Sequence, residues 1–187
     1  MVLSSPTSLA LTLLLASPFQ WFTVAGAKTF RIPRCSDSGA GWGGTAFLLA
    51  TAVVLWRGFF RGLDPVAAIE GCMFSVASLV LYEWARRTIA GRRFTIALAG
   101  EVPDELCESG PYRYIRHPFY LSYVVAAAGM LVASPTLIPA VVFAFNMTLF
   151  TYMAMDDERT LAASPLAAAY GDYKRRVGFL LLLPRGR

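Results

Sequence analysis

The stretch GPYRYIRHPFY, from Gly110 to Tyr120, places two arginines, three tyrosines and the chain's one histidine directly before an apolar segment. Gly110 and Pro111 form a turn signal, and Pro118 suits the first turn of a helix, which needs no N–H there. His117 is therefore predicted at or near the N-cap of that helix. The unpaired N–H groups of such an end attract carboxylates and other anions. An anion-binding site and an ordinary aromatic and basic membrane belt are the two interpretations of this pattern.

A second polar run, from Met155 to Leu161, holds the three consecutive acids Asp156, Asp157 and Glu158. Acids at the C-terminal end of a helix oppose the helix dipole, so we expect an arginine cluster or a bound cation to compensate them.

Further along, the run YGDYKRR sets Tyr170 and Tyr173 three residues apart, and Lys174, Arg175 and Arg176 follow. The alternative to a binding role for these cations is an amphipathic helix that lies on the membrane surface.

A further acid, Glu83, lies near the end of an apolar run, in the sequence YEWARR. Ionisable residues inside a membrane are costly and often functional. Arg86 and Arg87 stand three and four residues later, however, so a structural ion pair on one helix face is the favoured interpretation.

The composition indicates that these polar runs are embedded in a membrane protein. Hydrophobic residues make up 56% of the 187 residues, charged residues only 16%, and the mean hydropathy is +0.52. Soluble domains carry about 25% charged residues, so much of this surface is expected to face lipid. The net charge of +5 does not indicate nucleic-acid binding, because the basic residues flank the apolar runs.

The three cysteines, Cys35, Cys72 and Cys107, are odd in number and form no CxxC pair. With a single histidine as co-ligand, a structural zinc site is disfavoured and no metal is expected, so free thiols are predicted. The sequence also has no phosphate loop and no GxSxG nucleophile turn.

Five apolar stretches have the length of membrane-spanning helices, about 20 residues in a bilayer. They cover residues 8–25, 44–56 (or to 60), 66–84, 119–133 and 137–155. The last two are expected to form a tight helical hairpin around Ser134 and Pro135. No Lys or Arg precedes the first stretch, which favours an uncleaved span over a signal peptide.

The basic residues predict the orientation of these spans. With the N-terminus outside, the inner segments 26–43, 85–118 and 156–187 hold 15 of the 17 Lys and Arg residues. The C-terminus is then cytoplasmic. Free thiols and the short N-terminal segment favour a bacterial inner membrane.

The motifs together resemble the isoprenylcysteine carboxyl methyltransferase family of integral-membrane enzymes that use S-adenosylmethionine. The resemblance covers about residues 109–184 and rests on the RHP stretch, the acidic pair at hairpin distance, the two spaced tyrosines and a final proline. It implies an all-α fold of about five transmembrane helices, with a cytoplasmic cofactor site built by the C-terminal half. Glu158 matches the second acid of the family pair, whereas Asp157 replaces a glutamate.

The resemblance also implies roles for individual residues. Arg116 and Glu158 would be catalytic, with Arg116 or another arginine orienting an acceptor carboxylate. Cofactor-binding residues would be Tyr112, Arg113, Tyr114, Ile115, His117, Pro118, Tyr120, Glu158, Tyr170 and Tyr173. Candidate substrate-binding residues are Glu83, Arg86, Arg87, Arg175 and Arg176.

The expected product is a carboxyl methyl ester of a lipophilic, isoprenylcysteine-like acid. Residues 1–187 are expected to form one domain. That domain divides into three N-terminal spans (1–90), a connector (91–118), the hairpin (119–155) and a cytoplasmic C-terminal segment (156–187). The alternatives are a phospholipid or thiol methyltransferase, an NADPH-dependent sterol-type reductase, and a non-catalytic membrane assembly module.

Overall fold

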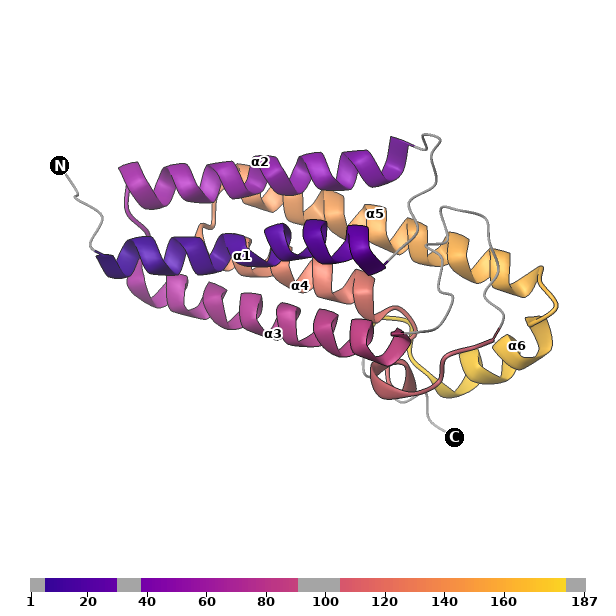
Figure 1. The fold of residues 1–187 in the computed structure, drawn as a ribbon. Coiled ribbons are helices and arrows are strands. Elements are labelled where there is room, and N and C mark those ends of the chain that lie inside the picture. The colour runs from indigo at the N-terminus through magenta and orange to yellow at the C-terminus, as the bar shows by residue number, and fades with distance from the viewer. Residues whose placement is uncertain (1–5, 30–37, 91–104, 181–187) are drawn as a thin grey trace.

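The computed structural model describes residues 6–29, 38–90 and 105–180, which form helices joined by short connections (Figure 1). The helices are α1 (Pro6–Thr29), α2 (Ser38–Phe60), α3 (Pro65–Ile89), the 3₁₀ helix η2 (Gly110–Arg113), α4 (Pro118–Ala133), α5 (Leu137–Ala162) and α6 (Ala167–Arg176). Within these ranges the only β-type pairing is an isolated bridge between Ile115 and Gly178. The predicted all-α fold is confirmed.

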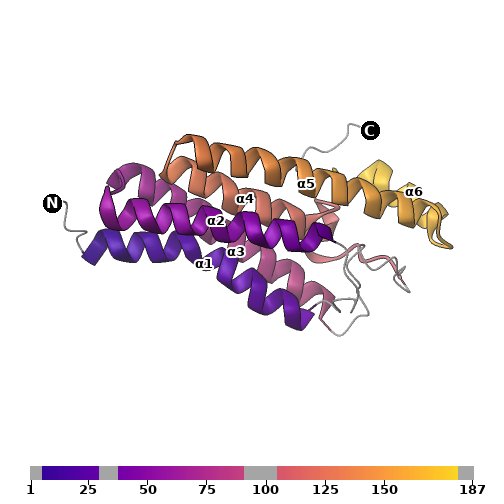
Figure 2. The same cartoon turned by 90° about the horizontal axis from the view of Figure 1, so that it is seen from above.

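Helices α1 to α5 lie side by side and alternate in direction (Figures 1 and 2). The connections 61–64 and 134–136 lie at the end of the bundle where α1 begins, and η2 and α6 lie at the opposite end. Helix α5 extends beyond the bundle and turns into α6 (Figure 2). The polar runs around residues 110–118 and 156–176 are therefore brought to one end of the molecule.

Local sequence signals set where two of the helices begin. The Asp64 side chain caps α3 by accepting a hydrogen bond from the Ala67 N–H at 2.9 Å, and Pro65 follows in the first turn. Helix α4 begins at Pro118 with His117 as its N-cap, as the sequence predicts, although the imidazole makes no capping hydrogen bond.

Helix α3 buries mainly small residues and exposes large apolar ones. On α3 the buried side includes Ala68, Gly71, Ser75 and Ser78, whereas the exposed large residues are Val66, Ile69, Met73, Phe74, Val76, Val80 and Trp84. In water this arrangement would leave a large apolar surface exposed. In lipid it is the expected one, since small residues allow close packing between membrane helices.

Helices α3 and α4 use this close packing. A Cβ atom on Gly71 would lie 2.6 Å from the Gly129 carbonyl oxygen, so the two backbones touch. The Ser78 hydroxyl donates across the same interface to the Ser122 carbonyl oxygen at 2.7 Å. This contact fixes α4, and with it the residues that precede α4, relative to α3.

Three described helices contain stretches long and apolar enough to cross a membrane: Leu9–Gly26, Pro65–Ile89 and Leu137–Ala162. Two shorter apolar stretches, Thr51–Phe60 and Pro118–Ala133, correspond to the second and fourth predicted spans. At 1.5 Å per residue α4 is about 24 Å long, less than a ~30 Å hydrocarbon layer. The count of five spans therefore stays a prediction.

The connection between α4 and α5 comprises only residues 134–136, which is the tight hairpin expected from the sequence. Helix α5 continues to Ala162, seven residues past the predicted end of its span. The acids Asp156 to Glu158 therefore lie inside the helix, because the chain first meets turn-forming residues at Ser164 and Pro165.

Candidate functional site

The centre of the polar end is the carboxylate of Glu158, on the last turns of α5, whose side chain is 10% exposed. Its Oε1 atom accepts a hydrogen bond from Arg116 Nη1, and its Oε2 atom accepts one from Lys174 Nζ at 2.5 Å. His117 Nε2 lies 3.4 Å from Oε1. Cationic side chains thus compensate the acidic run, as the sequence led us to expect.

Arg116 is held in a fixed position by more than this ion pair. Its side chain is 5% exposed, and its guanidinium carbon lies 5.3 Å from the centre of the Phe179 ring. Its backbone N–H donates to the Gly178 carbonyl oxygen at 3.0 Å, next to the bridge between Ile115 and Gly178. The segment after α6 therefore covers Arg116.

His117 is buried between aromatic rings. Its ring stacks on Tyr120 at a centroid distance of 5.8 Å and meets the edge of Phe179 at 5.2 Å. Burial lowers the pKa of His117, and the nearby Arg116 and Lys174 charges lower it further, while Glu158 acts in the opposite direction. The imidazole is consequently neutral at pH 7.

Asp157 occupies the other side of this cluster. Its Oδ2 atom accepts a hydrogen bond from the Tyr120 hydroxyl at 3.0 Å and lies 4.0 Å from His117 Nδ1. Two buried polar atoms, Asp157 Oδ1 and Arg116 Nε, make no hydrogen bond within the described part of the chain. They leave one acceptor and one donor for a ligand.

Two tyrosines of α6 close the cluster from the C-terminal segment. The Tyr173 hydroxyl donates to the Tyr112 carbonyl oxygen at 2.7 Å, which ties α6 to η2. Tyr170 is buried, its ring lies 6.1 Å from that of Tyr173, and burial together with the Glu158 carboxylate raises the pKa of its phenol.

The structure therefore assembles part of the residue set that the sequence singled out. Around Glu158 it gathers residues from α5, η2, the start of α4, and α6: Tyr112, Ile115, Arg116, His117, Pro118, Tyr120, Asp157, Tyr170 and Tyr173. All of them are buried or nearly buried.

Other predicted site residues point elsewhere. Arg113 and Tyr114 are exposed, and Tyr114 packs its ring 6.3 Å from Trp84. Arg175 pairs with Asp172, and Arg176 donates to Glu108 at 2.8 Å, both on the outside.

The acid at the end of α3 forms the ion pair that its spacing indicates. Glu83 accepts hydrogen bonds from Arg86 and from Arg87, the latter at 3.2 Å. The three side chains satisfy one another on one helix face.

Two residues of the cluster were missed by sequence reasoning. Lys174 was named only as part of a basic run, and Phe179 was not singled out. The one available signal for Lys174 was its position directly after Tyr173, which puts it on the same helix as the buried tyrosines.

Among the described residues no group of three or more His, Cys, Asp and Glu side chains forms a metal site. The connector residues 91–104, Cys35 and Pro184 lie outside the described residues.

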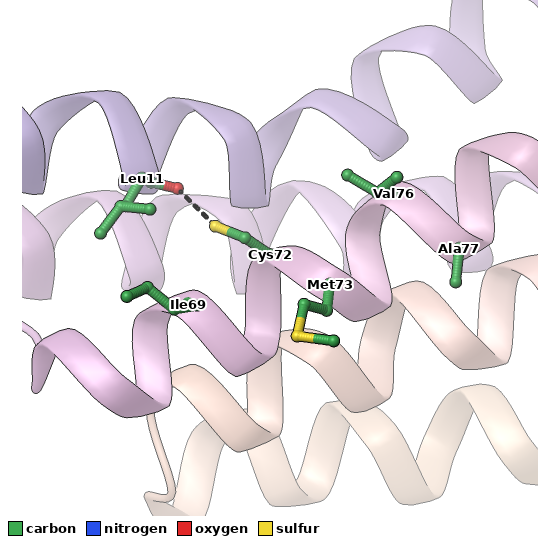
Figure 3. Close-up of a pocket in the computed structure, with 6 residues that line it drawn as sticks. All are labelled: Leu11, Ile69, Cys72, Met73, Val76 and Ala77. Atoms are coloured by element: carbon green, nitrogen blue, oxygen red, sulfur yellow. Dashed lines mark hydrogen bonds between the residues drawn. The ribbon is translucent and has the colours of Figure 1, made fainter.

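A separate apolar hollow of about 440 Å³ lies between α1 and α3 (Figure 3). Its lining is Leu11, Ile69, Cys72, Met73, Val76 and Ala77, and the Cys72 thiol donates to the Leu11 carbonyl oxygen at 3.4 Å. Cys72 and Arg86 are about 20 Å apart along α3, so this hollow is remote from the end of α3 that lies beside η2.

The fold and the site define a bundle of apolar helices with a buried cluster of charged and aromatic side chains at one end. The model of the isoprenylcysteine carboxyl methyltransferase (ICMT) family, a family of membrane methyltransferases, matches residues 72–163, and this match supports membership of the chain in that family. The match begins in α3, earlier than the motifs that suggested the resemblance, and stops before α6. No curated protein and no solved structure matches the chain.

Proposed function

We propose that this protein transfers a methyl group from S-adenosylmethionine to the carboxylate of a lipophilic acid of the isoprenylcysteine type. The observation that carries the proposal is the buried Glu158 carboxylate, enclosed by Arg116, His117 and Tyr170 at the end of an apolar bundle. Family membership supplies the reaction class, and the chemistry of these side chains supplies the donor and acceptor classes.

The residues present fit S-adenosylmethionine, which is a sulfonium cation with an amino-acid part and an adenine. Glu158 and the unpaired Asp157 Oδ1 suit its cationic groups, and the unpaired Arg116 Nε–H suits its carboxylate. The rings of Tyr120 and Phe179, which pack against His117, give the site aromatic walls, which suit a heterocycle or a cation. We infer that the residues gathered around Glu158 hold this cofactor.

When bound, S-adenosylmethionine would supply an activated methyl group, whose carbon would bond to the acceptor oxygen as the carbon–sulfur bond breaks and leaves its electron pair on sulfur. A carboxylate acceptor is already deprotonated, so no general base is required. This agrees with a single histidine that is buried and neutral. The chain's own contribution is to hold the two reactants in line and to exclude water.

Arg116 fixes the Glu158 carboxylate, and Phe179 with the backbone at Gly178 fixes Arg116. His117 donates from Nε2 to the same carboxylate when its proton is on that atom. These residues preorganise the acid before a ligand arrives. The apolar tail of an acceptor would approach the site through the lipid that surrounds α3 to α5.

We further propose that this end of the bundle faces the cytoplasm of a bacterial cell. The described basic residues support this orientation, since Arg57 and Arg61 are at the α2–α3 turn and the others lie toward the η2 and α6 end.

Calorimetric titration of the detergent-purified protein with S-adenosylhomocysteine and, separately, with NADPH tests the proposal. Binding of S-adenosylhomocysteine alone supports it, and binding of NADPH alone would instead indicate a reductase. Glu158→Gln should weaken S-adenosylhomocysteine binding at least about tenfold, because hydrogen bonds to a charged group are lost. Arg159→Gln is the matched control, since Arg159 is the exposed neighbour of Glu158 on α5. Equal affinity in both variants would refute the role of Glu158.

A further inference from the structure

We propose that Lys174 is the residue that binds the acceptor carboxylate, and that it moves between Glu158 and the acceptor during each turnover. This inference rests on the proposed function, because it takes the acceptor to be a carboxylate and the site around Glu158 to hold the methyl donor. It assigns a role to a lysine that the basic run in the sequence does not distinguish from the two arginines after it.

The first argument is exposure. Lys174 contacts the buried Glu158 carboxylate at 2.5 Å, yet its own side chain is 45% exposed. Arg116, which contacts the other carboxylate oxygen, is 5% exposed and covered by Phe179. Of these two cations, only Lys174 reaches from the buried acid to the molecular surface.

The second argument is how each cation is held. Arg116 is fixed by Glu158, by the Phe179 ring and by its backbone bond to Gly178. The Lys174 ammonium is attached to a flexible stem on the last turn of α6, and Glu158 is its ion-pair partner. The free-energy cost of breaking the ion pair with Glu158 is therefore much smaller for Lys174 than for Arg116.

The third argument concerns the four arginines outside the cluster that the sequence offered for the acceptor. Arg86 and Arg87 are engaged with Glu83, Arg175 with Asp172, and Arg176 with Glu108. These ion pairs lie away from Glu158. These four arginines are thus engaged with other acids, whereas Lys174 is paired with Glu158 itself.

Charge balance gives the sequence of events. Once Glu158 engages the cationic groups of the methyl donor, it no longer needs the Lys174 ammonium, which is then available to an acceptor carboxylate. Methylation converts that carboxylate into a neutral ester, so the ammonium loses its partner. Lys174 then returns to Glu158, which favours release of the ester over the acid.

The test compares one acid with its own ester in the full-length protein saturated with S-adenosylhomocysteine. The probes are N-acetyl-S-farnesylcysteine and its methyl ester, which share the same tail and differ in the charge of the carboxyl group. In the wild type the acid should bind about tenfold more tightly than the ester, the size expected for a charged hydrogen bond. Lys174→Gln should abolish this preference and leave S-adenosylhomocysteine affinity within about threefold.

Arg175→Gln is the matched control, because it removes one positive charge from the adjacent position while its ion pair with Asp172 lies outside the site. It should keep the preference for the acid, and Lys174→Arg should restore part of it. The role of Lys174 would be overturned if Lys174→Gln kept the preference for the acid, or if the wild type showed no such preference. In either case, binding of S-adenosylhomocysteine would still support the donor proposal. A wild type that fails to bind S-adenosylhomocysteine would overturn the proposed function itself.

Discussion

Arg116 and Glu158 are 42 residues apart in the sequence and form a buried ion pair. The pair joins the residue just before the N-cap of α4 to the last turns of α5. Because these helices run antiparallel and their connection is only three residues long, the start of one must lie beside the end of the other. The hairpin thus converts two distant polar motifs into one site.

Loss of one partner of this pair should destabilise the protein. Glu158→Gln leaves the Arg116 guanidinium buried without its counter-charge, and removal of one member of a buried pair typically costs about 3–5 kcal/mol. We expect a clearly lower midpoint of thermal unfolding in matched detergent. The double variant Arg116→Gln with Glu158→Gln should recover part of the loss, since no buried charge is then left unpaired. A midpoint unchanged by Glu158→Gln would show that the pair contributes little.

The second prediction concerns the charge of His117. Its lowered pKa means that the unfolded chain binds a proton before the folded protein does as the pH falls. Stability should therefore be independent of His117 above its ordinary pKa of about 6.5 and should decrease below that value, down to the lowered pKa of the folded state.

The chain has a single histidine, so a histidine-labelled, tag-free sample reports this ring alone in a ¹⁵N NMR titration. The spectrum should be that of a neutral imidazole at pH 6.5. Glu158→Gln should lower the midpoint further, because the carboxylate favours the charged ring. A midpoint at or above the ordinary value in the wild type would contradict the burial argument.

The third prediction concerns the turn that precedes the site. Gly110 has φ +59°, and a Cβ atom there would lie 2.2 Å from Thr88 Oγ1 on α3. Gly110→Ala should therefore destabilise the protein by more than about 1 kcal/mol, the usual cost of a left-handed backbone for a residue with a Cβ atom. It should also weaken S-adenosylhomocysteine binding, because η2 carries Tyr112 toward the site.

Gly171→Ala on α6 provides the control for this change. A Cβ atom there would have no neighbour within 4 Å, and alanine is favoured over glycine in a helix by about 1 kcal/mol. We expect this variant to unfold at the same or a slightly higher temperature. Equal effects of the two substitutions would show that the turn at Gly110 is not constrained by Thr88.

Much of the scaffold could be predicted from local signals. Apolar length located the helices, the short segment after Ala133 predicted the hairpin, and Pro118 predicted the start of α4 with His117 as its N-cap. These features depend on residues that are neighbours in the sequence, so a single chain is enough to infer them. The end of α5 was predicted too early, because the acids were taken to mark the end of a helix that in fact continues to Ala162.

The sequence by itself determined that a basic, aromatic motif and an acidic run would stand at the same end of a membrane hairpin. Only the tertiary structure decided which cation meets which acid. Lys174, Arg175 and Arg176 are equivalent as a run of charges, yet the rotation of α6, fixed by the buried Tyr170 and Tyr173, directs only the first toward Glu158. A helix turns by about 100° per residue, so neighbours in a basic run face different surroundings, and packing selects among them.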